Sequence, residues 1–447
     1  MLNLQQCIEN IPSSRVAFTN DSRQYTYADV RQLQISNMDT LQKLKGATVV
    51  INGRERLEFA LLLSLIDSHV EKVLFLPRDI EKSLHKKFYQ EANIHYEVYL
   101  EDNSLKYNIV TDFNKKQVKE SNYQTEWIIP TSGTTSIPKL VSHSFQSLTK
   151  STKFNVELGG GFKWGLVFDI YRFSGIQVFL QAVLAGSTLI ITNPSQNMSK
   201  LLTFLAEKKC NALSATPSFW RKVLMTKESD KLKIKRITLG GEISDNNILQ
   251  ALNKKYPYAK ISHIYASTEV GVGFSVTDGK EGFPKKYLDG ILDSIRIKID
   301  SEGLLWIAPE NKGQRYLSHD KMYNDAGYIN TGDLVEARGD RVYFLGRDTG
   351  AINVGGNKVQ PEEVESKLLA SGLLSAAYVY AMNNSIMGSL VCADVVLLDS
   401  VFDKKEVKAQ ILKYCRENLE GFKVPAIVKF VNELKTTQSG KLKRDNK

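Results

Sequence analysis

Short apolar runs alternate with amphipathic, helix-like runs from Trp127 onward, and this order narrows the possible folds more than any other property of the sequence. Strand-like runs occupy 187–192, 211–216, 236–241 and 261–267, and helix-like runs occupy 199–209 and 244–256. Thr216-Pro217 begins a further helix, because proline is tolerated in the first helical turn. A repeated β-α-β order predicts a mainly parallel sheet covered by helices. In such sheets, ligands bind at the carboxyl ends of the strands.

The pattern changes near Ile295, where IRIKID, GLLWIAP, YINTGDLVEA and RVYFLG follow one another as short alternating runs. Turns with Gly and Asp join them, which predicts an antiparallel β subdomain. After GRDTG at 346–350 the chain begins again with a helix, two strands, a helix and a strand. We therefore predict an α/β fold with a large N-terminal domain, residues 1–347, of helix-covered, mainly parallel sheets plus the antiparallel β subdomain. A small α+β domain, residues 348–447, follows it.

Composition excludes several classes of protein. The 447 residues are enough for about three domains, and 42% hydrophobic with 24% charged residues is typical of a soluble enzyme. The apolar stretch 59–66 is much shorter than the ~20 residues of a membrane helix, and the N-terminus lacks the pattern of a secretion signal. The four cysteines have no metal-ligand spacing, which favours a reducing cytoplasm over zinc or disulfides.

The formal net charge of +10 is compatible with nucleic acid, a membrane surface or anionic small substrates as partners. The lysines are spread along predicted helix faces and form no dense basic block before the tail. We therefore expect no nucleic acid partner and no membrane span.

Residues 131–139 read TSGTTSIPK and directly follow the apolar run WIIP. A loop with five hydroxyl side chains, a glycine and a lysine can surround a phosphate group with donors and one cation. It is not the common nucleotide loop, because G-x-x-x-x-G-K-[ST] is absent from the chain. Taken alone, it could also be an ordinary Ser/Thr-rich turn.

Further suggestive segments follow in order: GGE after RITL, HIYASTEVG at 263–271, YINTGDL at 328–334, GRDTGAINVGGNKVQPEEVE at 346–365 and SGKLKR at 439–444. With TSGTTSIPK, they resemble the adenylate-forming superfamily of acyl-CoA synthetases, peptide-synthetase adenylation domains and luciferases. RQYTYADVRQLQ also looks like that family's first signature, so the resemblance covers about 25–444. TSGTTSIPK, HIYASTEVG, YINTGDL, GRDTGAINVGGNKVQPEEVE and SGKLKR are five motifs in the expected order, which makes coincidence improbable.

The resemblance implies that a carboxylic acid attacks ATP to give an acyl-adenylate and pyrophosphate, and that a thiol then displaces AMP. Such transfers depend mainly on charge neutralisation around phosphorus. Thr268 would meet the phosphate region, Glu269 would hold Mg²⁺, which prefers oxygen ligands, and Lys441 would bridge the attacking carboxylate and the α-phosphate. The residues that would hold the phosphates are Thr131, Ser132, Gly133, Thr134, Thr135 and Lys139.

For the nucleoside, the resemblance implies that Tyr265 stacks on adenine, that Asp333 accepts from the ribose hydroxyls and that Arg347 adds a donor nearby. The loop that lets the purine approach the backbone would be Gly240, Gly241 and Glu242. Simpler explanations exist for single residues: Asp333 suits a turn and Arg347 a surface ion pair. Likewise, Glu269 could cap a helix and Lys441 could be a solvated tail lysine. The complete, ordered set favours the functional interpretation.

The family completes its second half-reaction by rotating its small C-terminal domain, which would present Gly355 and Gly356 to the pantetheine arm of the thiol. Thr349 stands at the position of the usual acidic or lysine hinge residue. Ser136 and Ala266 replace glycines that the family prefers, and the proline usual before the last motif is absent. We read these departures as marks of a compact, divergent member.

The acceptor and the acid stay open. INVGGNKVQPEEVE looks more like the acyl-CoA ligase version, which makes coenzyme A the favoured thiol acceptor. The alternatives are a stand-alone enzyme that loads an acyl carrier protein and a catalytically inactive nucleotide sensor. We expect 164–175 and 270–274 to line the acid pocket. Asp169 lies too far from Gly186 to match the amine-binding aspartate of relatives, and Arg172 would meet a second carboxylate or pair with Asp169.

Overall fold

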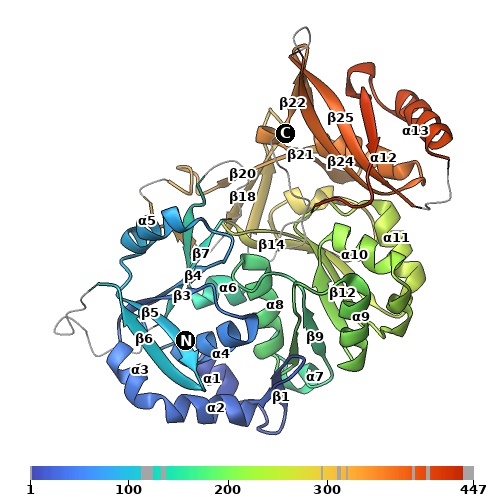
Figure 1. Cartoon of the computed structure of the whole chain (residues 1–447). Coiled ribbons are helices and arrows are strands. Elements are labelled where there is room, and N and C mark those ends of the chain that lie inside the picture. Colours follow the sequence, from blue (N-terminus) through green and yellow to red (C-terminus); the bar gives the residue numbers. More distant parts are fainter. Residues whose placement is uncertain are drawn as a thin grey trace.

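The structure, a computed structural model, describes residues 3–111, 124–131, 137–292, 295–309, 314–318, 321–384, 388–398 and 403–435. In these residues the chain forms four sheets with helices packed around them (Figure 1). The predicted α/β class is confirmed, including the antiparallel subdomain and a small α+β unit at the C-terminal end. None of the described helices has the length and hydropathy needed to cross a membrane.

The eight-stranded sheet has the order β14-β13-β12-β11-β9-β10-β1-β2, and its strands are parallel except for β2 and β14. Apolar side chains on one face of β10–β12 pack under α9, α10 and α11, while the other face of β9 and β10 packs against α8. Its strands are β1 Val16–Thr19, β2 Gln24–Thr26, β9 Lys163–Leu166, β10 Thr188–Ile191, β11 Ala212–Ala215, β12 Arg236–Gly240, β13 Lys260–Ser267 and β14 Gly271–Val276.

The seven-stranded sheet has the order β19-β8-β7-β4-β3-β5-β6 and holds the beginning of the chain. Its strands are β3 Thr48–Asn52, β4 Lys72–Leu76, β5 Tyr96–Glu101, β6 Ser104–Ile109, β7 Glu126–Pro130, β8 Leu140–His143 and β19 Gln314–Tyr316. The buried Asp67 carboxylate ties this part together, because it accepts from the Trp127 indole at 2.9 Å and from the Leu4 backbone at 3.1 Å.

The antiparallel sheet has the order β15-β21-β20-β18-β17-β16. Its strands are β15 Phe283–Pro284, β16 Ile291–Leu292, β17 Ile295–Ile299, β18 Leu304–Pro309, β20 Ile329–Arg338 and β21 Arg341–Arg347. The helices of these N-terminal layers are α1 Leu4–Glu9, α2 Tyr27–Ser36, α3 Met38–Leu44, α4 Arg56–Ile66, α5 Lys82–Ala92, α6 Phe145–Thr149, α7 Val156–Gly159, α8 Phe173–Val183, α9 Met198–Glu207, α10 Pro217–Met225 and α11 Asn246–Lys255.

The last sheet, with its own apolar core, lies beyond β21 (Figure 1). It holds β22 Ile352–Val354, β23 Asn357–Val359, β24 Leu374–Asn384, β25 Gly388–Leu397 and β26 Ile427–Phe430, with helices α12 Pro361–Ala370 and α13 Lys404–Asn418. The expectation that this part begins with a helix is wrong, because the β22–β23 hairpin comes first. Gly355 (φ +57°) and Gly356 (φ +89°) form its two-residue turn, which needs positive φ at both positions. The domain boundary at 347/348 stays a prediction.

Candidate active site

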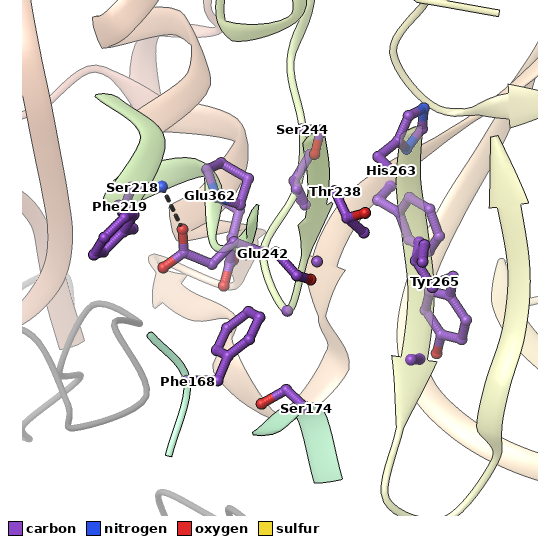
Figure 2. A pocket seen from close by; sticks show the side chains of 18 of the residues that line it. Phe168, Ser174, Ser218, Phe219, Thr238, Glu242, Ser244, His263, Tyr265 and Glu362 are labelled. Carbon is purple, nitrogen blue, oxygen red and sulfur yellow. Dashed lines mark hydrogen bonds between the residues drawn. The ribbon is translucent and has the colours of Figure 1, made fainter. Parts of the chain in front are cut away.

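One cavity of about 2810 Å³ extends along one face of β12 and β13 and past their carboxyl ends to the C-terminal sheet, and Figure 2 shows part of it. Most of the motif residues that the structure describes line this cavity: Thr131, Lys139, Gly240, Gly241, Glu242, Tyr265, Thr268, Glu269, Asp333 and Arg347. Ser132, Gly133, Thr134, Thr135 and Lys441 lie outside the described residues. Gly355 and Gly356 form a hairpin tip and are not among the lining residues.

The two ends of the TSGTTSIPK loop are joined by hydrogen bonds. The Thr131 amide donates to the Lys139 carbonyl at 2.8 Å, and the Lys139 amide donates to the Thr131 hydroxyl at 3.0 Å. These bonds continue the β7–β8 pairing, so the loop leaves the sheet at a fixed point. The Lys139 ammonium lies 4.8 Å from the centre of the Tyr316 ring, a favourable cation–π contact at the cavity wall.

Arg172 holds Thr131, at the start of this loop, from the side and does not pair with Asp169. One guanidinium nitrogen donates to both Asp79 oxygens, at 2.9 and 3.0 Å, and the other donates to the Thr131 carbonyl at 3.1 Å. The arginine side chain is only 13% exposed. Asp169 is buried, accepts from the Tyr171 amide at 3.2 Å and is not among the cavity-lining residues. Sequence reasoning missed Asp79, because it lies 93 residues before its partner.

Tyr265, Asp333 and Arg347 form one connected group at the cavity wall. The Tyr265 hydroxyl donates to one Asp333 oxygen at 2.5 Å, and the Arg347 Nε lies 2.8 Å from the other. The Tyr265 ring is stacked with Phe274 and with Phe344, each 5.3 Å away between ring centres. Burial raises the Tyr265 pKa well above its usual value, and the Asp333 charge raises it further, so the hydroxyl remains a donor.

Glu242 stabilises the start of α10 from inside the cavity. Its carboxylate accepts from the Ser218 amide at 2.9 Å, the dashed line in Figure 2. A carboxylate at a helix N-terminus satisfies a free N–H and interacts favourably with the helix dipole. The preceding Gly241 has φ +81°, which lets the chain turn sharply between β12 and this contact.

The turn that carries Thr268 and Glu269 is supported by Ser267, Gln314 and His143, to which the sequence-based prediction gave no role. The Ser267 hydroxyl accepts from the Val270 amide at 3.1 Å, and the Gln314 amide nitrogen donates to the Val270 carbonyl at 3.1 Å. His143, opposite Gln314 in the β8–β19 pair, is fully buried. Burial lowers the His143 pKa to about 4, although a hydrogen bond with the Thr268 backbone opposes this shift, so the ring is neutral at pH 7.

Gly346 lies at one of the contacts between the N-terminal layers and the C-terminal sheet with its helices. It has φ +146°, and a Cβ there would lie 2.5 Å from a Glu362 carboxylate oxygen and 2.9 Å from the Gln360 amide oxygen. These side chains come from the start of α12, so the bare glycine allows α12 to lie directly against β21. Thr349 lines the cavity in the short 3-10 turn Asp348–Gly350, and its role as a hinge stays a prediction.

The described residues include no group of three or more His, Cys, Asp or Glu side chains that could hold a metal. Glu269 therefore offers one carboxylate at the cavity wall, and further oxygen ligands for Mg²⁺ would have to come from the phosphates and water. The four cysteines are buried and unpaired.

Comparison with known proteins agrees with this arrangement. The family model described as AMP-binding enzyme matches residues 45–323, and the model of the AMP-binding enzyme C-terminal domain matches residues 363–441. The chain therefore belongs to the AMP-binding enzyme family, within the adenylate-forming superfamily of ligases.

Among curated proteins, the chain is 26% identical to a 2-succinylbenzoate–CoA ligase of Bacillus pumilus, over 72% of this chain and 68% of that protein. It is 25% identical to a plipastatin synthase component of Bacillus subtilis over 81% of this chain, but it spans only 15% of that protein's length. A D-alanine–D-alanyl carrier protein ligase of Staphylococcus aureus is 24% identical over 73% of this chain and 71% of that protein.

Solved structures share the fold over nearly the whole chain. An anthranilate CoA ligase in complex with anthranoyl-AMP has a TM-score of 0.79 at 16% identity, covering 99% of this chain and 96% of the other. The o-succinylbenzoate CoA synthetase of Bacillus subtilis in complex with its acyl-adenylate has a TM-score of 0.70 at 20% identity, with the same coverage.

Proposed function

We propose that the protein activates a carboxylic acid with ATP, releases pyrophosphate and transfers the acyl group from the adenylate to a thiol, with coenzyme A as the favoured acceptor. The observation that carries this proposal is that the phosphate-loop stem, the Tyr265–Asp333–Arg347 group and the Thr268–Glu269 turn all line one cavity. Three separate parts of the sheet architecture thus present a cation, carboxylates and hydroxyls to the same space.

In the proposed reaction, Thr131, Lys139 and the loop between them hold the β- and γ-phosphates, and Asp333 accepts from the ribose hydroxyls. Asp333 is well suited to this role, because Arg347 and the Tyr265 hydroxyl hold its carboxylate in place. Arg347 and Tyr265 hold the Asp333 carboxylate before ATP arrives, so less side-chain entropy is lost when ATP binds.

Thr268 would donate to the phosphates and Glu269 would supply a ligand to Mg²⁺. When bound, Mg²⁺ would neutralise charge on the phosphate oxygens of ATP. Lys441 would stabilise the charge that develops between the attacking carboxylate and the α-phosphate. Support for its approach comes from Asn432, Glu433 and Leu434, which precede Lys441 by seven to nine positions and line the cavity.

After adenylation, rotation of the C-terminal part about Thr349 would bring Gly355 and Gly356 to the thiol. The CoA ligases and the carrier protein ligase among the relatives support both acceptors. The basic charge does not decide between them, because coenzyme A and carrier proteins are both acidic.

The test is exchange of labelled pyrophosphate into ATP, measured with fatty, aryl, hydroxy and amino acids. Exchange that depends on one class of acid supports adenylation, and adding coenzyme A or a carrier protein then identifies the acceptor. Lys441→Ala should reduce exchange strongly, while Lys435→Ala, at an exposed site on the same segment, should leave it unchanged. ATP binding without exchange for any acid would instead favour the inactive nucleotide sensor.

A further inference from the structure

A row of hydroxyl side chains crosses three neighbouring strands of the eight-stranded sheet. Ser214 of β11 is the register partner of Thr238 of β12, which is in turn the partner of Ser262 of β13. Register partners point to the same face of a sheet, and all three residues line the cavity. Interior parallel strands are normally apolar on both faces, so this polar row is an exception that the packing of the fold does not require.

The other face of the same strands is ordinary core. Leu213 of β11 and Ile237 and Leu239 of β12 are fully buried and pack beneath α9, α10 and α11. The polar character is therefore confined to the side facing the cavity. The Ser262 hydroxyl donates to the Ile237 carbonyl at 3.5 Å. A simple alkyl chain bound here would displace water from the Ser214 and Thr238 hydroxyls and give them no hydrogen bond in return.

Helix α8 adds a second polar wall. Ser174, Gln177 and Gln181 are spaced by three and four residues, which places them on one side of the helix, and all three line the cavity. The remaining side of α8 is apolar and buried, with Ile176 and Phe179 fully enclosed. Figure 2 shows Phe168 and Ser174 near one border of this space and Thr238, His263 and Tyr265 near the other.

Two cations follow the hydroxyl row toward the amino ends of the strands. Arg236 of β12 and Lys260 of β13 are register partners, two residues before Thr238 and Ser262, and both line the cavity. The Arg236 guanidinium lies 4.5 Å from the centre of the Phe162 ring, which fixes it without neutralising it. In the stretch of chain that the structure describes, neither cation forms an ion pair.

We propose that the acid activated by this protein carries a second anionic group, which Arg236 and Lys260 bind, with polar atoms between it and the reacting carboxylate. The proposal rests on the proposed function, because the reacting carboxylate must lie at the nucleotide end near Gly240. Four residue steps from Gly240 to Arg236 correspond to about 13 Å along the strand. The two anionic groups of the substrate are therefore separated by a distance of that order.

Pyrophosphate exchange with matched acids tests the proposal. The probes are straight-chain dicarboxylic acids from hexanedioic to tetradecanedioic acid, each compared with the monocarboxylic acid of the same length and with a diacid containing an internal amide. We expect kcat/KM at least tenfold higher for one or two diacid lengths than for the matched monoacids, and higher still with the amide. Equal or better exchange with the monoacids would overturn the proposal while leaving the proposed function intact. Absence of exchange with this panel, but exchange with an aryl, hydroxy or amino acid that carries no second anionic group, would also overturn the proposal alone. Absence of exchange with the acids of both panels would refute both.

Variants separate the acid from other anions. Arg236→Met and Lys260→Met, which keep an unbranched side chain of similar length, should raise KM for the preferred diacid about tenfold and leave KM for the monoacid unchanged. Lys235→Met is the matched control, because Lys235 is exposed and is not a cavity-lining residue. Calorimetric binding of the diacid and monoacid acyl-sulfamoyl adenosines should show the same selective loss without turnover. An increase in KM for coenzyme A alone would assign the two cations to the acceptor and refute the proposal.

Discussion

Replacing Arg172 by methionine should weaken ATP binding rather than acid binding. Arg172 makes three hydrogen bonds: one to the carbonyl of Thr131, the first residue of the phosphate loop, and two to Asp79, which hold the guanidinium in place. Methionine fills the space of the side chain but donates none of these bonds. Thr131 then loses its lateral support, and its position must be fixed when ATP binds instead of beforehand.

The size of the effect follows from exposure. Hydrogen bonds to charged groups contribute about 1.5–3 kcal/mol when protected, whereas exposed pairs contribute about 0–1 kcal/mol. The Asp79 side chain is 42% exposed and that of Arg172 13%, so we take about 1 kcal/mol for the pair and about 1 kcal/mol for the bond to Thr131. The total of about 2 kcal/mol corresponds to a roughly 30-fold loss in kcat/KM for ATP.

The assay is pyrophosphate exchange at varied ATP and at varied acid. KM for ATP should rise in Arg172→Met, and Arg172→Lys should restore little, because lysine lacks the planar fork that reaches both partners. Arg315→Met is the control: Arg315 makes the same two-oxygen contact, to Glu126 at 3.1 and 2.9 Å, but is 60% exposed. If Arg172→Met raised only KM for the acid, Arg172 would be a substrate contact and this reasoning would fail.

Three further changes test other parts of the structure. Gly346→Ala should separate α12 from β21, because the Cβ of the new alanine would collide with the Glu362 carboxylate. We expect faster proteolysis between residues 346 and 361 and slower adenylation. Unchanged rates of both would contradict the close contact. Burial lowers the His143 pKa to about 4, so between pH 6.5 and 4 the unfolded chain is protonated at this histidine and the folded protein is not. The wild-type free energy of unfolding should therefore fall by about 3 kcal/mol as pH decreases from 6.5 to 4, and His143→Gln should remove this decrease. Asp67 should act in the opposite direction, because burial raises its pKa to about 6. The wild-type free energy of unfolding should fall as pH rises from 3.8 to 6, and Asp67→Asn should remove this decrease. For both, urea midpoints of variant and wild type are compared across pH, and parallel curves would refute the assignment.

Local sequence signals predicted much of the fold, because strand and helix periods in the β-α-β region are strong. The site could be placed in outline because Tyr265 and Glu269 belong to a motif at the carboxyl end of β13, where ligands collect. Asp333 was recognised from its own motif, although it lies inside β20 and not at a strand end. What the sequence could not predict are contacts between distant segments. Asp79 has no motif around it, and the position of α12 against Gly346 depends on how the C-terminal sheet, with its own apolar core, meets β21.

The initial helix expected after residue 350 failed for a local reason. Residues 352–359 have little helical period, and the Gly355-Gly356 pair between short apolar runs is a hairpin signal. The polar face of β11–β13 was also visible in principle, because Arg236 and Thr238 alternate with Ile237 and Leu239. Only the register of neighbouring strands reveals that such residues form a row.

The parallel register of β12 and β13 also implies how acid preference can change in descendants of this chain. Side chains return to the cavity face every second residue, so a cation can move along it only in steps of about 6.6 Å. Placing arginine at position 238 in place of Thr238 would shorten the preferred acid by one such step, while Asp333 and Tyr265 at the nucleotide end stayed untouched. New substrate lengths would then arise as discrete jumps from single substitutions, each compatible with the same handling of ATP.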